Sequence, residues 1–212
     1  MLPRTVTAIL FDWDGTLCDS AAASLRAFRK SLAEFGVAFT DAEYKAVYTP
    51  RWYRMYQSLG LPEHCWERAD QQWLHHYREE APELLPGASE VLDLLRRREI
   101  QLGVVTNGTR GRIERELARL GLSSTFQAVV CCEDVTQIKP HPEGVEQALA
   151  LLGCSRQACC YVGDAPEDIQ AGKSARVLTV AVRSEYVDDH RLEACCPDAI
   201  LANVEELPGI LA

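Results

Sequence analysis

The sequence predicts an α/β protein with a doubly wound, mostly parallel sheet and an inserted α-helical domain. Short apolar runs alternate with amphipathic helical segments from about residue 85 to the end of the chain, the pattern of repeated βα units. One further apolar run, residues 6–11, lies near the N-terminus, and the long stretch between these two regions shows no strand-like alternation. We therefore expect a core domain from residues 1–16 and 84–212, with a helical domain formed by residues 17–83.

The expected strands are nearly continuous apolar runs, because helices cover both faces of a parallel sheet. Six runs of this kind are present: residues 6–11, 100–105, 128–132, 158–162, 178–182 and 199–201. Apolar residues recur at helical spacing between them, and Gly or Pro marks several boundaries. These helices are expected at residues 88–98, 110–120, from 143 to about 152, and from Pro166 onward. Right-handed crossovers then produce the doubly wound sheet.

The inserted segment is expected to be helical, with a break at Gly60-Leu61-Pro62. Apolar residues fall on one helical face within residues 21–35, a second helix begins near Thr40, and residues 44–77 are unusually aromatic. Because the insertion directly follows the first acidic turn, it should overhang that turn and is a candidate lid. Aromatic side chains in such a segment more often pack in a core, but four residues are considered for substrate contact: Arg51, Trp52, Tyr53 and Arg54.

Composition and charge limit the classes of partner. The chain has 212 residues, of which 47% are hydrophobic and 25% charged, the balance of a soluble globular protein. Its formal net charge of -9 argues against nucleic acid, because the phosphate backbone requires a basic face. An anionic small molecule is still compatible with this charge, since local cationic groups and a metal can hold it.

Neither export nor membrane attachment is expected. Residues 1–5 lead directly into the first strand without a signal peptide, and no apolar run approaches membrane-spanning length. We therefore expect a cytoplasmic protein that is a monomer by default, with a dimer as the alternative.

The cysteines are expected to be reduced. Their number, nine, is odd, and three pairs are adjacent: Cys131 with Cys132, Cys159 with Cys160, and Cys195 with Cys196. The first two pairs lie in apolar runs, where a thiol behaves as a small hydrophobic side chain. No C-x-x-C spacing occurs, so a zinc site is not expected.

Two carboxylates follow the first expected strand. Asp12 and Asp14 lie on alternate residues after Phe11, and Gly15 follows them with the backbone freedom that other residues lack. Ligands bind at the carboxyl ends of strands in open α/β sheets, and like charges this close are costly unless a cation or a catalytic task explains them. The alternative is a structural turn in which Thr16 caps the next helix.

Polar side chains also follow three later strands: Thr106, Asn107, Lys139, Asp164 and Asp168. Carboxylates from separate strands form a hard oxygen cage, which suits Mg²⁺ better than Zn²⁺. A lysine, a hydroxyl, an amide side chain and the backbone N–H groups that begin the helix at 110–120 suit a phosphoryl group. Each residue also has a structural explanation, as a loop lysine, a helix cap or an acid in the first turn of a helix.

These motifs resemble the four ordered motifs of the haloacid dehalogenase superfamily. They are Asp12-Trp13-Asp14-Gly15-Thr16-Leu17, Thr106-Asn107-Gly108, Lys139-Pro140, and Gly163-Asp164 with Asp168. A single motif is a weak signal, whereas four in order are specific. The helical insertion resembles, in type, the α-helical cap of phosphoglycolate phosphatase-like and β-phosphoglucomutase-like members. The resemblance thus covers essentially the whole chain and implies a Rossmann-like core with an inserted cap.

The resemblance implies catalytic roles for three residues. Asp12 would be the nucleophile that forms an aspartyl-phosphate, and Asp14 would protonate the leaving oxygen and later activate water. Lys139 would neutralise the nucleophile and the phosphate. Physical reasoning agrees, because a carboxylate repels an approaching dianionic phosphate unless a metal and a cation offset the charge.

The resemblance also implies binding roles. The phosphate ligands would be Thr106, Asn107 and Lys139. The Mg²⁺ ligands would be Asp12, Asp14 through its backbone carbonyl, and Asp164. Asp168 would hold either the water shell of the metal or Lys139. One departure is Ala165, where many relatives carry Ser or Thr; it removes a hydroxyl but no ligand charge.

The implied function is a Mg²⁺-dependent phosphatase that acts on a small phosphorylated metabolite, a phosphomonoester of the phosphoglycolate or sugar phosphate type. A phosphomutase of the β-phosphoglucomutase type uses the same core but must keep water from the aspartyl-phosphate. A non-catalytic phosphate-binding module would keep the fold alone, although no motif acid is missing. A dehalogenase fits less well, because Asp14 and the metal cage serve phosphoryl chemistry.

Overall fold

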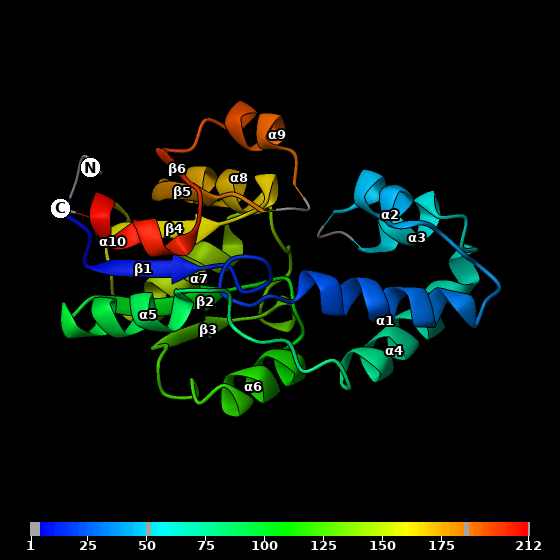
Figure 1. Cartoon of the computed structure of the whole chain (residues 1–212). Helices are drawn as coiled ribbons and strands as arrows, with labels where there is room; N and C mark the ends of the chain where they lie inside the picture. Colours follow the sequence, from blue (N-terminus) through cyan, green and yellow to red (C-terminus); the bar gives the residue numbers. More distant parts are fainter. Residues whose placement is uncertain (1–4, 50–51, 185–186, 212) are drawn as a thin grey trace. The chain divides into compact units, whose positions relative to one another are not determined.

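The computed structural model describes residues 5–49, 52–184 and 187–211. The chain divides into two compact units, the sheet unit (Met1–Cys18 with Glu83–Ala212) and the helical unit (Asp19–Pro82) (Figure 1). Each unit buries its own cluster of apolar side chains. Arg51, which the sequence analysis considered for substrate contact, lies outside the described residues.

The sheet unit contains a six-stranded sheet in the order β3-β2-β1-β4-β5-β6, with parallel pairing throughout. Its strands are β1 (Ala8–Phe11), β2 (Gln101–Val105), β3 (Ala128–Val130), β4 (Cys159–Gly163), β5 (Leu178–Val182) and β6 (Ala199–Leu201). The strand order reverses between β1 and β4, which is where an open parallel sheet forms a crevice for ligands. The predicted fold class is therefore confirmed.

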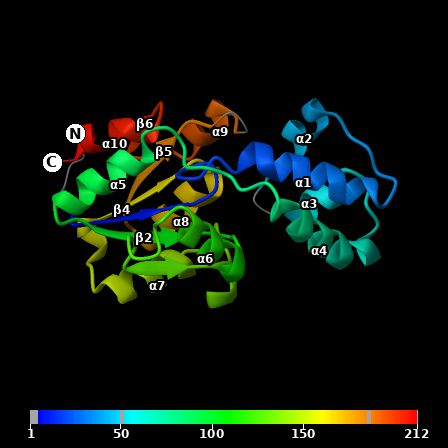
Figure 2. The ribbon, with the colours of Figure 1, turned by 60° about the horizontal axis from the view of Figure 1, so that its bottom comes forward.

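Alternate residues of the strands pack into two apolar clusters. Ile9 and Phe11 belong to a cluster with side chains of α5 and α6, whereas Ala8 and Leu10 belong to a cluster with side chains of α7 and α8. In Figure 2, α5 and α10 lie on one side of the strands and α7 lies on the other. The helices are α5 (Ala88–Arg97), α6 (Arg110–Arg119), α7 (Glu143–Leu152), α8 (Pro166–Ala175), α9 (Asp189–Ala194) and α10 (Leu207–Ile210). Burial on both faces explains the continuous apolar runs.

β3 ends two residues before its predicted end. The strand stops at Val130, and the short 3-10 helix η2 (Cys132–Asp134) follows. The Asp134 carboxylate accepts a hydrogen bond from the backbone N–H of Cys131 at 2.7 Å, which is part of the capping box that begins η2. Two further 3-10 helices, η3 (Arg156–Ala158) and η4 (Val204–Glu206), precede β4 and α10.

The helical unit packs around aromatic side chains. Its elements are α1 (Ala21–Ala33), α2 (Asp41–Val47), α3 (Trp52–Ser58), the 3-10 helix η1 (Glu63–Cys65) and α4 (Trp66–Tyr77). Thr40 caps α2 in a capping box with Glu43. The ring of Phe28 on α1 meets Tyr44 edge-on and stacks on Tyr56, with centroids 5.6 and 5.1 Å away. The described residues of this unit contain no strand, as predicted.

The structure describes all nine cysteines, and each is a free thiol. Cys159 and Cys160 are completely buried in β4, where burial raises the pKa of Cys159 to about 12. These two residues therefore act as small apolar side chains, as expected. No helix in the described part of the chain is both long and apolar enough to cross a bilayer.

Candidate active site

The turn after β1 brings the first acidic residue next to β4. The backbone N–H of Asp12 donates to the carbonyl of Val162 at 2.8 Å, so Asp12 continues the ladder between the two strands. Gly15 then adopts a positive φ of 79°. A Cβ at this position would lie 2.4 Å from Oδ2 of Asp164. Glycine is therefore required both for the turn and for the close approach of the Asp164 carboxylate.

Lys139 bridges two carboxylates, that of Asp12 after β1 and that of Asp168 in α8. Its ammonium group donates to Oδ1 of Asp12 at 2.5 Å, to Oδ1 of Asp168 at 2.6 Å and to the carbonyl of Val105 at 3.3 Å. The residue is only 5% exposed. Burial alone would lower the pKa of Lys139, but the carboxylates of Asp12 and Asp168 raise it well above its usual value. Lys139 is therefore a buried cation paired with two carboxylates, not a solvated loop lysine.

Asp168 lies in the first turn of α8 and has three partners. Its Oδ2 accepts from the backbone N–H of Ala165 at 2.9 Å, and its Oδ1 accepts from Lys139 and, at 3.2 Å, from the hydroxyl of Tyr161. Both carboxylate oxygens are thus used within the protein. Of the two roles that the resemblance implied for Asp168, this geometry favours holding Lys139.

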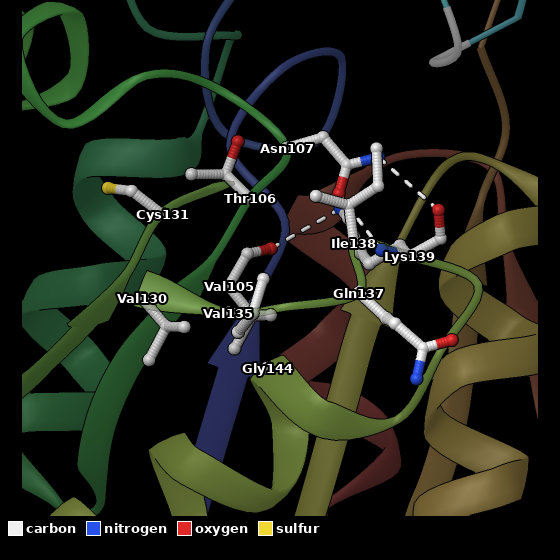
Figure 3. Close-up of a pocket in the computed structure, with 10 residues that line it drawn as sticks. All are labelled: Val105, Thr106, Asn107, Val130, Cys131, Val135, Gln137, Ile138, Lys139 and Gly144. Atoms are coloured by element: carbon white, nitrogen blue, oxygen red, sulfur yellow. Dashed lines mark hydrogen bonds between the residues drawn. The ribbon is translucent and has the colours of Figure 1, made fainter. Parts of the chain in front are cut away.

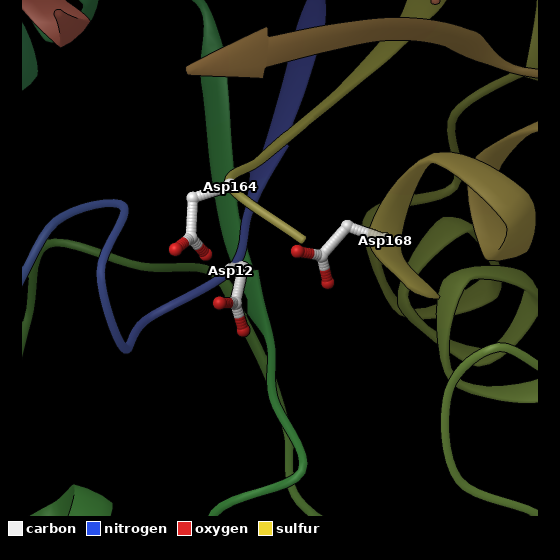
Figure 4. Close-up of side chains that lie close together, drawn as sticks. All are labelled: Asp12, Asp164 and Asp168. Atoms are coloured by element: carbon white, nitrogen blue, oxygen red, sulfur yellow. The ribbon is translucent and has the colours of Figure 1, made fainter. Parts of the chain in front are cut away.

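Three carboxylates converge at the carboxyl edge of the sheet. Asp12, Asp164 and Asp168 are buried, and one oxygen from each lies within 4.8 Å of the others (Figure 4). Burial raises the pKa of Asp12 to about 7, and Lys139 opposes this effect. Burial, with the charges of Asp12 and Asp168, raises the pKa of Asp164 well above its usual value. Such a cluster gains stability from a bound cation, because the cation offsets charge that Lys139 alone leaves uncompensated.

The loop after β2 places Thr106 and Asn107 beside Lys139. The Thr106 hydroxyl accepts from the backbone N–H of Gly108 at 2.9 Å. The Asn107 side chain accepts from the backbone N–H of Lys139 at 3.1 Å and donates to its carbonyl at 3.5 Å (Figure 3). Asn107 therefore fixes the backbone that carries Lys139, a contact that its place in the sequence does not reveal.

A cavity of about 10 Å³ lies under this loop. Its lining is mostly apolar with a few polar groups: Val105, Thr106, Asn107, Val130, Cys131, Val135, Gln137, Ile138, Lys139 and Gly144 (Figure 3). This volume is at the lower limit of what can hold one water molecule. The cavity is therefore too small for an organic substrate.

The carboxylate of Asp14 pairs with Arg112 of α6 and is not part of the carboxylate cluster. Arg112 donates from Nη1 to Oδ1 of Asp14 at 2.8 Å and from Nη2 to Oδ2 at 2.5 Å. Arg112 also lies 3.4 Å from both oxygens of Glu116. Glu116 in turn accepts from the indole N–H of Trp13 at 2.6 Å. Burial raises the pKa of Glu116, and Arg112 opposes this effect.

Arg112 and Glu116 were not among the site residues predicted from the sequence. A signal was present, because both residues fall on the buried face of α6 with Ile113 and Leu117. Charged residues at i and i+4 on an apolar helical face need buried partners. The sequence does not show that the partners are Asp14 and Trp13.

The N-terminus of α6 already holds an anion from the protein itself. The backbone N–H of Arg110 donates to both carboxylate oxygens of Glu133, at 3.1 and 2.9 Å. The sequence analysis expected this helix start to face an anion. The anion that the structure places there is Glu133.

The haloacid dehalogenase-like hydrolase family matches residues 9–182 of the chain. The chain therefore belongs to this family and is a hydrolase, and the resemblance identified from the four motifs is confirmed. The match includes every residue proposed for the site, from Asp12 to Asp168.

Relatives of known name cover nearly the whole chain. Pyrophosphatase PpaX of Bacillus velezensis is 31% identical over 210 residues, 98% of this chain and 97% of the relative. Pyrophosphatase PpaX of Oceanobacillus iheyensis is 29% identical over 210 residues, with the same two shares. The crystal structure of a predicted phosphoglycolate phosphatase from Haemophilus somnus has a TM-score of 0.88 at 22% identity and covers 98% of each chain. This last likeness concerns the fold alone.

Proposed function

We propose that the protein is a Mg²⁺-dependent phosphatase that hydrolyses a small phosphomonoester through an aspartyl-phosphate on Asp12. The observation that carries this proposal is the environment of Asp12, which is buried, held at one oxygen by Lys139 and close to two further carboxylates. A carboxylate in a purely structural role does not need such a site. A carboxylate that attacks phosphorus does, because the incoming phosphate is itself an anion.

The reaction would have two steps. An oxygen of Asp12 forms a bond to phosphorus as the bond from phosphorus to the leaving oxygen breaks, and Asp14 gives that oxygen a proton. Water then attacks the aspartyl-phosphate, Asp14 takes a proton from the water, and inorganic phosphate leaves. Lys139 would offset the charge of Asp12 and phosphate throughout, and the Thr106 hydroxyl with the loop at Asn107 would hold phosphoryl oxygens.

Mg²⁺ fits the donor set of the site. The oxygens of Asp12 and Asp164, with the backbone carbonyl of Asp14, are the hard ligands that this ion prefers. When bound, the ion would supply positive charge that stabilises the transferring phosphoryl group. Asp168 would keep Lys139 in place, since both of its own oxygens are occupied.

Inorganic pyrophosphate is a second candidate substrate. The relatives named pyrophosphatase match this chain over 98% of its length at 29 to 31% identity. The same two steps would cleave pyrophosphate, with phosphate as the leaving group. The sequence assigns residues 17–83 to a cap. This helical unit would determine whether the protein prefers pyrophosphate or a phosphomonoester. Its exposed Tyr53 and the neighbouring Trp52 and Arg54 remain candidates for contact.

A substrate panel tests these proposals directly. Purified protein would be assayed for phosphate release from phosphoglycolate, β-glucose 1-phosphate and pyrophosphate, with Mg²⁺ and with a chelator. We expect release that requires Mg²⁺, and the best catalytic efficiency identifies the substrate. Glucose 6-phosphate formed from β-glucose 1-phosphate would favour the phosphomutase. Absence of Mg²⁺-dependent release from all three substrates and from p-nitrophenyl phosphate would contradict the phosphatase and favour a binding module.

A further inference from the structure

Arg112 has an environment that packing of α6 does not explain. The side chain is 6% exposed and comes from a helix almost one hundred residues away in sequence from the turn that it contacts. Each terminal nitrogen of its guanidinium faces one oxygen of Asp14. This two-point contact fixes the orientation of the carboxylate as well as its position, which a single lysine ammonium group cannot do.

The surroundings of Arg112 are shaped to hold the guanidinium. A Cβ on Gly108 would lie 2.2 Å from Nη2 of Arg112, so the guanidinium packs against backbone in the loop that follows Asn107. Both oxygens of Glu116 lie 3.4 Å from Nη1 of Arg112, the nitrogen that also donates to Oδ1 of Asp14. Glu116 in turn accepts from the indole N–H of Trp13. Trp13 and Asp14 are consecutive residues. Two consecutive residues of the turn after β1, Trp13 and Asp14, therefore bind the interacting pair Glu116 and Arg112 on α6.

We propose that Arg112, anchored by Glu116, is a positioning residue that orients the Asp14 carboxylate for proton transfer to the leaving oxygen. This inference rests on the proposed function, in which Asp14 moves that proton. Arg112 itself acts only through Asp14.

The pairing of Arg112 with two carboxylates allows Asp14 to change its contacts during turnover. When Asp14 turns one oxygen towards the leaving group, Glu116 remains within 3.4 Å of the guanidinium and continues to offset its buried charge. Glu116 thus keeps Arg112 in place while Asp14 gives a proton in the first step and takes one in the second.

A matched pair of substrates separates positioning from general damage. Phenyl phosphate and p-nitrophenyl phosphate have the same ring, but the nitro group stabilises the departing phenolate, so only phenyl phosphate depends strongly on proton transfer. The variant Arg112→Met with Glu116→Gln removes the cation, neutralises the acid and keeps an acceptor for Trp13. We expect kcat/KM for phenyl phosphate to fall at least about 10-fold further than kcat/KM for p-nitrophenyl phosphate.

Two further variants keep the test decisive. Arg112→Lys retains the charge without the two-point contact and should show the same selective loss even if the double variant does not fold. Arg115→Gln, on the exposed side of α6, should leave both values unchanged. Suppose that the wild type is active and that the Arg112 substitutions either lower kcat/KM for both substrates by the same factor or leave both values unchanged. Either result would show that Arg112 does not position Asp14. If the wild type has no Mg²⁺-dependent activity towards either substrate, the proposed function falls as well.

Discussion

The two units bury different kinds of side chain. The sheet unit buries charged groups at one edge of its sheet, among them Asp12, Lys139 and Arg112. Among the described residues of the helical unit, the buried polar side chains are Ser20 and Ser31, and the rest of its core is apolar and aromatic. Ser31 simply donates to the carbonyl of Ala69 at 2.7 Å. Buried charge costs stability unless something compensates it. We therefore expect the chemistry in the sheet unit, whereas the core of the helical unit is formed mainly by apolar and aromatic packing.

Replacement of the proposed nucleophile should have the largest effect. Asp12→Asn is expected to reduce turnover by about four orders of magnitude or more, because no bond to phosphorus can form. The melting temperature should stay the same or rise, since the substitution removes a buried charge while Lys139 keeps Asp168 as its partner. Asp93→Asn, on an exposed helix position, is the control. An unfolded Asp12→Asn protein would indicate a structural acid.

Removal of the buried cation Lys139 should have the second largest effect, in this case on stability. Lys139→Met leaves the carboxylates of Asp12 and Asp168 without their shared donor, and loss of one partner of a buried ion pair costs about 3–5 kcal/mol. Chemical denaturation without Mg²⁺ measures this change in unfolding free energy. Lys173→Met, at an exposed position of α8, should change it by less than about 0.5 kcal/mol. Equal effects of the two substitutions would show that Lys139 is not a structural counterion.

Two glycines with a similar positive φ allow a comparison between the two units. Gly15 has a φ of 79° and Gly36, in the helical unit, has a φ of 72°. An added Cβ meets Asp164 at position 15 and meets nothing within 4 Å at position 36. Substitution by alanine should cost each protein about 1 kcal/mol of stability through the strained backbone. Gly15→Ala alone should also lose most of its Mg²⁺-dependent turnover. Similar activity in both variants would contradict a role for the Asp164 contact.

The smallest effect is expected at Asp70, a half-buried acid of the helical unit. Partial burial raises the pKa of Asp70 from 3.8 to about 6, so the folded state binds more protons than the unfolded state between these values, and stability falls as pH rises through this window. Asp70→Asn should therefore be more stable than the wild type above about pH 6 and equal to it below about pH 4. The expected gain is about 1 kcal/mol, because solvent screening of this half-buried group reduces the full value of the pKa shift. Thermal melts across this range measure the difference. Glu67→Gln, exposed on the same helix, should show no such trend.

Sequence reasoning predicted the features that depend on local pattern. The strands and the polar residues at their ends follow from apolar runs that stop abruptly, as at Phe11 and Val105. It did not predict that Asp14 meets Arg112, 98 residues away, or that Asn107 holds the backbone of Lys139. Such contacts depend on how helices and loops pack in three dimensions. β3 ends where the backbone N–H of Cys131 donates to the Asp134 carboxylate, a contact that hydrophobic periodicity cannot predict.

The central claim is that Asp12 takes up phosphorus, and the most direct measurement is detection of the phosphoenzyme. Asp14→Asn should still be phosphorylated by p-nitrophenyl phosphate with Mg²⁺, because that leaving group needs no proton, but should hydrolyse the intermediate slowly. Mass spectrometry of the rapidly quenched protein should then find one added phosphoryl group on the peptide that contains Asp12. A phosphoryl group on another residue, or turnover by the wild type with none on Asp12 in the variant, would contradict the account.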